Sequence, residues 1–213
     1  MRLELGDSDY PAAGVAGGSS GTAKWGTAVV RVCERLRDRL AAAGPPGPDG
    51  VEVTVDTADE VKGQAKLARA AFGAQFVEAR VDLGTGEVRV PRALGVFGVG
   101  RVINPKLARS QLVGGMTMGI SMALFEEGVI DPRFGDYANH DLASYHVAAC
   151  ADIADLDATW VEEDDDQLNP MGSKGIGEIG IVGTAAAVAN AVHDATGIRV
   201  RDLPLRLDRL VRA

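Results

Sequence analysis

The sequence has few of the residues that build metal centres and disulfide frameworks. It contains two cysteines and three histidines in 213 residues, and these form no CxxC pair and no zinc-type spacing. Cys33 and Cys150 are therefore predicted to be core thiols, and no metal is expected to be ligated directly by a side chain. Aromatic residues make up only 5% of the chain, against 27 glycines, which favours close backbone packing over large aromatic pockets.

Positive charge and long apolar runs are also scarce. With 22 Lys and Arg against 30 Asp and Glu, the net charge of −8 argues against nucleic-acid binding, which needs cations to neutralise phosphates. No apolar run is long enough to span a membrane, and the N-terminus lacks the apolar stretch of a secretory signal. We expect a cytoplasmic protein without membrane contact.

Hydrophobic periodicity predicts an α+β fold with helices packed on mixed or antiparallel sheets. Helical patterns cover residues 22–43, 58–71, 107–127 and 179–196. Strand patterns cover residues 51–55, 75–82, 87–99, 159–162 and 198–202, of which the second and third form a hairpin. We predict one region, residues 1–213, with a division into sub-lobes of about 1–72 and 73–213 as an option.

The most distinctive stretch is the run from Asn169 to Gly180, which places one carboxylate, Glu178, among four glycines. Glycine permits positive φ and the close approach of another molecule, and N–H groups at a helix start bind anions. A cofactor- or substrate-facing loop that presents Glu178 is the favoured interpretation. A structural turn is one alternative. A dinucleotide fingerprint is another, because residues 175–180 fit G-x-G-x-x-G, although a polar loop precedes them where that motif needs a strand.

Two further segments allow both a binding and a structural interpretation. The amide of Gln111, beside Gly114 and Gly115, can offer a donor and an acceptor to a ligand, or it can simply be solvated. Residues 17–20 can bind an anion through backbone N–H groups and hydroxyls, or serve as an N-cap with a flexible lead-in.

The helix at 107–127 has glycines in its interior, at positions 114, 115 and 119. Each of these glycines lowers the stability of the helix by roughly 1 kcal/mol relative to alanine. Their presence therefore predicts that another group lies close to the helix backbone. The three methionines of this helix, Met116, Met118 and Met122, are predicted to be core. In the following loop, residues 139–141 and 145–146 either line a pocket or have structural roles.

Five segments together resemble the large, molybdenum-cofactor-binding subunit of the xanthine dehydrogenase/aldehyde oxidase family. They are Gly17–Ser20, Gly100–Lys106, Ala108–Gly115, Asn139–Ala143 and Leu168–Glu178. The resemblance runs nearly end to end and is strongest to bacterial aldehyde-oxidising members with separate subunits.

The resemblance implies a role for each matching residue. Glu178 matches the catalytic base. Gln111 matches a glutamine beside the molybdenum–pterin. The residues that match segments around the rest of the cofactor are Gly17, Gly18, Ser19 and Ser20 at its phosphates, Arg101, Val102, Ile103, Asn104, Pro105, Lys106 and Leu107 near its nucleotide end, and Lys174, Gly175, Ile176 and Gly177 in the loop around it.

The implied activity is hydroxylation of an aldehyde or N-heteroaromatic substrate with oxygen from water. The implied cofactor is molybdenum–molybdopterin, in its cytosine dinucleotide form, and the electrons leave through iron–sulfur clusters and FAD on partner subunits. Export of the complex alongside a signal-bearing partner subunit is left open. Because the family subunit is several times longer, the chain is expected to be its C-terminal part and to need the upstream part for activity. A truncated, non-catalytic remnant and a dinucleotide-binding module are the alternatives.

Overall fold

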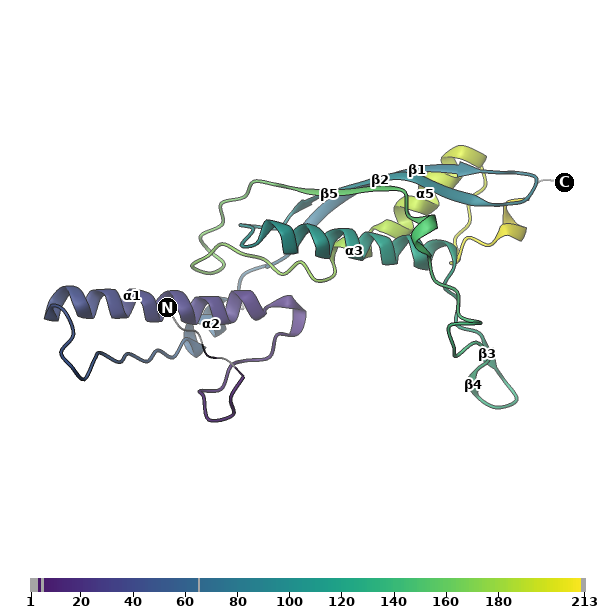
Figure 1. The fold of residues 1–213 in the computed structure, drawn as a ribbon. Coiled ribbons are helices and arrows are strands. Elements are labelled where there is room, and N and C mark those ends of the chain that lie inside the picture. The colour runs from purple at the N-terminus through teal and green to yellow at the C-terminus, as the bar shows by residue number, and fades with distance from the viewer. Residues whose placement is uncertain (1–3, 5, 65, 212–213) are drawn as a thin grey trace. The chain divides into compact units, whose positions relative to one another are not determined.

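The computed structural model describes residue 4 and residues 6–64 and 66–211, and it divides the chain into two compact units (Figure 1). The first unit comprises Met1–Ala70 and Glu163–Gly175, and the second comprises Ala71–Glu162 and Ile176–Ala213. Among the described residues, no helix is both long enough and apolar enough to cross a membrane.

The first unit is built on one long helix, α1 (Gly21–Ala43), which a 3₁₀ turn, η1 (Gly17–Ser19), precedes. Gly44 ends α1 with φ of 77° and donates its N–H to the Leu40 carbonyl over 2.9 Å. The short helix α2 (Ala58–Gln64) is joined to α1 by Arg31, whose guanidinium lies 2.8 Å from the Glu60 carboxylate. The hydrogen bond from Arg31 lowers the pKa of Glu60 below its usual range.

Three sequence predictions in this unit are wrong. The segment at 51–55 is not a strand, because arginines of α1 occupy its carbonyls: Arg35 donates to Thr54 O at 3.0 Å and Arg39 to Glu52 O at 2.9 Å. The second helix ends at Gln64 and does not continue to residue 71. Cys33 is exposed on α1, since this amphipathic helix has few neighbours to cover it.

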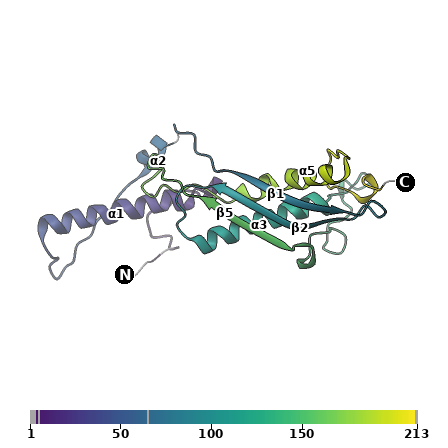
Figure 2. The same cartoon turned by 90° about the horizontal axis from the view of Figure 1, so that it is seen from above.

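The second unit is a three-stranded sheet with order β1-β2-β5. The predicted hairpin is confirmed: β1 (Phe72–Val81) pairs antiparallel with β2 (Val88–Gly98) around a turn that Asp82 caps. On its other edge β2 pairs in parallel with β5 (Asp155–Val161). The helices α3 (Pro105–Leu124) and α5 (Thr184–Thr196) cover one face of this sheet (Figures 1 and 2).

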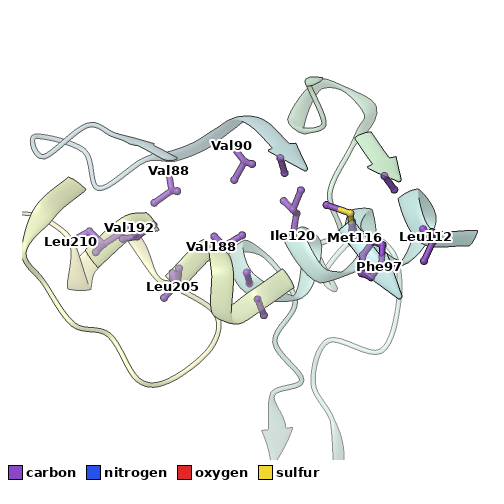
Figure 3. Packing of buried hydrophobic residues seen from close by; sticks show 14 of the residues in the cluster. Val88, Val90, Phe97, Leu112, Met116, Ile120, Val188, Val192, Leu205 and Leu210 are labelled. Carbon is purple, nitrogen blue, oxygen red and sulfur yellow. The ribbon is translucent and has the colours of Figure 1, made fainter. Parts of the chain in front are cut away.

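The core of this unit lies between that face of the sheet and the two helices. Phe97 from β2, Met116 and Ile120 from α3, and Val188 and Val192 from α5 are almost completely buried and pack together (Figure 3). Because the side chains of β2 alternate between the two faces of the sheet, its buried positions fix the register of the hairpin.

Glycine lets the helices of this unit approach one another closely. A Cβ on Gly115 would lie 3.0 Å from backbone atoms of Gly180, and a Cβ on Gly119 would collide with the side chain of Thr184. The expectation that something comes close is thus confirmed at two glycines, and what comes close is the chain's own helix. Gly114 has no neighbour within 4 Å of that position.

Other predictions in the second unit need correction. The predicted helix 179–196 breaks at Gly183 into α4 (Ile179–Val182) and α5, although it ends at Gly197 (φ 73°) as expected. Residues 198–202 form no strand: the Ile198 N–H donates to the Thr196 hydroxyl of α5 and not to a neighbouring strand.

Exposed residues account for the remaining corrections. Met118 and Met122 are exposed, because they point away from the sheet that buries Met116. Cys150 is exposed in the 3₁₀ turn η2 (Cys150–Asp152) and is not a core thiol. A small hairpin of β3 (Ile130–Asp131) and β4 (Asp136–Tyr137) follows α3.

The glycines of α3 give a matched test of this packing. We expect Gly119→Ala to lower the free energy of unfolding by about 1–3 kcal/mol, because its methyl group overpacks against Thr184. Gly114→Ala, on the same helix with open space around it, is expected to raise that free energy by about 0.4–1 kcal/mol. Urea denaturation of both variants checks this. Equal effects at the two positions would contradict the packing.

Candidate functional site

Glu178 occupies the N-cap position of α4. Its backbone carbonyl accepts hydrogen bonds from Ile181 N at 3.0 Å and Val182 N at 3.3 Å. Its side chain is exposed, and no hydrogen bond or ion pair joins it to another described residue. The Glu178 carboxylate thus does not cap α4, whereas the Glu178 backbone takes part in the hydrogen bonds of this helix.

The backbone on the N-terminal side of Glu178 is held by Gln111. This side chain projects from α3, and its Nε2 donates to the Gly177 carbonyl over 2.7 Å. The structure therefore brings together two predicted site residues that lie 66 positions apart in the sequence. Its side chain is exposed, so it is a bound and accessible amide rather than a freely solvated one.

The backbone on the C-terminal side of Glu178 is held by Gln75, which the sequence analysis did not select. Gln75 Nε2 lies 2.9 Å from the Gly180 carbonyl, and its Oε1 accepts the Thr184 hydroxyl at 2.7 Å. A Cβ on Gly180 would lie 2.5 Å from Leu112 O, so this glycine also fits directly against α3. In the sequence Gln75 is one polar residue in an alternating strand, and nothing there distinguishes it.

In the first unit, the turn before α1 contains two successive residues with positive φ. Gly18 and Ser19 have φ of 66° and 57°, and Ser20, at the N-cap, donates its hydroxyl to Gly17 O over 2.7 Å. No side chain caps the first turn of α1, which also has no acidic residue. The N–H groups at this helix start are therefore available to an anion.

The glycine-rich loop reaches the same turn. A Cβ on Gly175 would lie 2.9 Å from Gly18 O and 3.0 Å from Ser19 Cβ. Glycine is required there because any side chain would push the two segments apart. Two parts of the predicted site, far apart in the sequence, are thus neighbours within this unit.

Asn169 organises the loop that leads to Gly175, although it was not among the predicted site residues. It is 5% exposed, its Nδ2 donates to Ser173 O over 2.8 Å, and its Oδ1 accepts from Met171 N at 3.1 Å. Lys174, next in the loop, forms an ion pair with Glu163 at 3.1 Å. The Asn-Pro-x-Gly spacing is typical of a side-chain-bonded turn and is the signal that could have identified Asn169.

Residues 101–107 form the approach to α3 and its first turn. Asn104 Oδ1 caps the helix by accepting the Leu107 N–H over 3.1 Å, and Pro105 follows at the start of the helix. Ile103 and Leu107 are 52% and 65% exposed. Asn104 and Pro105 therefore have a local structural role, while apolar side chains beside them remain uncovered.

Hydrogen bonds to residues 126–129 hold the loop at 139–146. Asn139 bridges Val129 N and Glu127 O, and Tyr145 donates to Glu126 over 2.9 Å. Hydrogen bonds from the Ser144 hydroxyl and backbone hold the pKa of Asp141 below its usual range. A cavity of about 610 Å³ lies beside these residues and is lined in part by Tyr137 and Leu142. Asn139, Asp141 and Tyr145 therefore have structural hydrogen-bond partners, and the same residues also line the cavity.

Two observations limit the chemistry of the site. Within the described part of the chain, no three His, Cys, Asp or Glu side chains gather as metal ligands would. The chain from Glu162 to Lys174 contains no β-strand that runs into Gly175, since β5 ends at Val161. The strand that a dinucleotide fingerprint requires is therefore missing, which argues against that alternative.

Comparison with known proteins identifies the family. The sequence profile described as "Molybdopterin cofactor-binding domain" matches residues 46–154, about half of the chain. The chain belongs to this family, as part of the molybdenum-binding large subunit of the xanthine dehydrogenase group.

Individual relatives agree with this assignment. The chain is 39% identical to the aldehyde oxidoreductase molybdenum-binding subunit PaoC of Escherichia coli, over 99% of its own length and 32% of that subunit. It is 41% identical to the putative xanthine dehydrogenase molybdenum-binding subunit XdhA of the same organism, over 66% of its length and 18% of that subunit. It thus spans about a third or less of these relatives.

A solved structure confirms the fold. The aldehyde oxidoreductase of Desulfovibrio desulfuricans superposes with a TM-score of 0.71 and 26% identity, over 94% of this chain and 23% of that one. The predicted α+β class, with helices on a mixed sheet, is therefore confirmed.

The role of Asn169 can be tested by proteolysis. In Asn169→Ala the backbone groups of the loop lose their hydrogen-bond partner. Each buried polar group left without a partner lowers the stability of the loop by about 1–3 kcal/mol. We expect trypsin to cleave after Lys174 roughly tenfold faster, because opening of the loop precedes cleavage. Gln167→Ala, whose exposed side chain bonds Asp166 nearby, is the control. Equal cleavage rates in the two variants would show that Asn169 does not hold the loop.

Proposed function

We propose that this chain is the C-terminal, cofactor-binding portion of a molybdenum hydroxylase, and that Glu178 is its catalytic base. The substrate is an aldehyde or an N-heteroaromatic compound. The observation that carries the proposal is the exposed Glu178 carboxylate, which lacks a partner among the described residues while the backbone on both sides of it is hydrogen-bonded. A carboxylate with a structural role would have a donor of its own.

The fit of the chain to a phosphate-bearing cofactor rests on backbone groups. Residues 17–20 offer uncapped N–H groups at the start of α1, which suit a phosphate, and Gly175 lies beside them. Within the second unit, Gln111 has an exposed amide, which we assign to the pterin. Residues 101–107 are assigned to the nucleotide end, which we take to be the cytosine dinucleotide form. Lys174, Ile176 and Gly177 complete the loop around the cofactor.

The chemistry divides between cofactor and protein. The molybdenum–molybdopterin cofactor supplies the two-electron oxidation when it is bound. Glu178 accepts a proton from the water-derived oxygen that is transferred to the substrate, a general-base role that contributes typically 10²–10⁴-fold to the rate. Because the side chain has no competing donor among the described residues, its oxygens are available for that proton.

The remaining partners are proposed from the relatives of the chain, which are subunits of larger enzymes. The chain covers about a third of PaoC, so we assign the rest of the cofactor and substrate site to an upstream part of the large subunit. An iron–sulfur subunit and an FAD subunit would carry the electrons away. We place the assembled enzyme in the cytoplasm.

The test is co-expression of the chain with the upstream part of the subunit, followed by measurement of bound molybdenum and of aldehyde oxidation. We expect Glu178→Gln to lower kcat by at least about 100-fold while the complex keeps its molybdenum. Glu162→Gln, an exposed carboxylate outside the assigned site, is the matched control and should retain full activity.

Two results would decide against parts of this proposal. Full turnover in Glu178→Gln would remove the assignment of the base. A complex of the unsubstituted chain that neither holds molybdenum nor oxidises aldehydes would instead identify a non-catalytic remnant.

A further inference from the structure

We propose that Gln75 is a positioning residue for Glu178, and that with Gln111 it forms a clamp on the backbone that bears this side chain. The glutamine clamp is defined as the two side-chain amides and the carbonyls they hold, Gly177 O for Gln111 and Gly180 O for Gln75. The inference rests on the proposed role of Glu178 and adds how that side chain is kept in place.

The segment around Glu178 is too short and too rich in glycine to hold its own shape. The helix α4 has four residues, well below the length at which a helix is stable by itself. Gly177, Gly180 and Gly183 surround it, and each of them gives the unfolded segment extra conformational freedom. The direction of the Glu178 side chain must therefore be fixed by contacts from other elements.

Gln75 supplies these contacts from β1 with both ends of its amide. The Nε2 group lies 2.9 Å from Gly180 O and 3.4 Å from Ile179 O, the two carbonyls that directly follow Glu178. The Oε1 atom accepts the Thr184 hydroxyl at 2.7 Å. One side chain thus joins β1, α4 and α5 at the break between the two helices.

The Thr184 end of this contact is closed to water. Thr184 is fully buried, and its hydroxyl also lies 2.8 Å from Gly180 O. A Cβ on Gly183 would lie 3.3 Å from Gln75 Oε1, so the glycine at the helix break leaves room for the amide. Loss of a partner in such a site leaves polar groups unsatisfied.

The two amides of the clamp bind the backbone before and after Glu178, and they come from different elements. Gln111 fixes the residue before it from α3, and Gln75 fixes the second residue after it from the sheet. Glu178 is then the free side chain on a backbone held at both ends. Such preorganisation matters because a displacement of about 1 Å at a reacting group can cost about 100-fold in rate.

The first measurement is hydrogen–deuterium exchange on the full chain, which needs no cofactor. In Gln75→Leu, similar in size but without a donor or acceptor, we expect amides of residues 179–184 to exchange about 3- to 10-fold faster. Glu78→Gln, on the same strand in a surface ion pair with Arg80, should exchange like the unsubstituted chain.

A pair of variants at Thr184 keeps the test valid if Gln75→Leu fails to fold. Thr184→Val has the same shape without the hydroxyl and should loosen the segment in the same way. Thr184→Ser retains the hydroxyl and should restore slow exchange. A serine variant that exchanges as fast as the valine variant would contradict the hydrogen-bond explanation.

The second measurement separates positioning from general stability. In the co-expressed enzyme, we expect Gln75→Leu and Thr184→Val to lower kcat about 10- to 100-fold, with KM changed less than about twofold and molybdenum retained. A merely structural role would lower the amount of loaded enzyme and leave the kcat of the remainder unchanged.

The outcomes distinguish this inference from the function on which it rests. Full turnover in Glu178→Gln would overturn the base and with it the catalytic meaning of the clamp. Unchanged exchange and unchanged kcat in Gln75→Leu, beside an inactive Glu178→Gln, would overturn the clamp alone.

Discussion

The second unit depends on the direct contact of the α4 backbone with the backbone of α3. Gly180 lies against Leu112 O and Gly115 lies against Gly180, so no side chain separates the two segments. This contact places the residues after Glu178 beside the helix that carries Gln111. Because it is made by glycines on both sides, it uses the small size of glycine as well as its flexibility, and it accounts for the cost of glycine inside α3.

Hydrogen bonds from neighbouring elements then fix the backbone that carries the Glu178 carboxylate. Side-chain amides from α3 and β1 bind the carbonyls on either side of Glu178, and the carboxylate itself remains exposed. In the first unit, too, the absence of a side chain permits a close contact, since Gly175 fits against the turn at Gly18 and Ser19. In each unit, taken by itself, glycine lets two backbone segments lie directly against one another.

Much of the fold could be predicted from local patterns. The hairpin β1–β2, the helices α1 and α3 and the helix stop at Gly197 all have strong periodicity or turn signals, and they are confirmed. The segments at 51–55 and 198–202 also have strand-like patterns, but a strand needs a partner, and other residues bond their backbones instead. The prediction that Cys33, Cys150, Met118 and Met122 are buried was wrong for a related reason. An apolar side chain is buried only where a neighbouring element covers it.

The sequence by itself determined the family, the glycine-rich motif and the residues that we propose carry chemistry, because these depend on residue type and spacing along the chain. Tertiary structure alone decided that Gln111 reaches Gly177, that Gly175 meets Gly18, and that Gln75 holds Gly180 at the end of the motif. It also decided that Asn169 holds the loop before Gly175. The physical reason is that a hydrogen bond between residues 66 or 105 positions apart leaves no periodic trace in the sequence. It exists only once the sheet and helices have brought its donor and acceptor together.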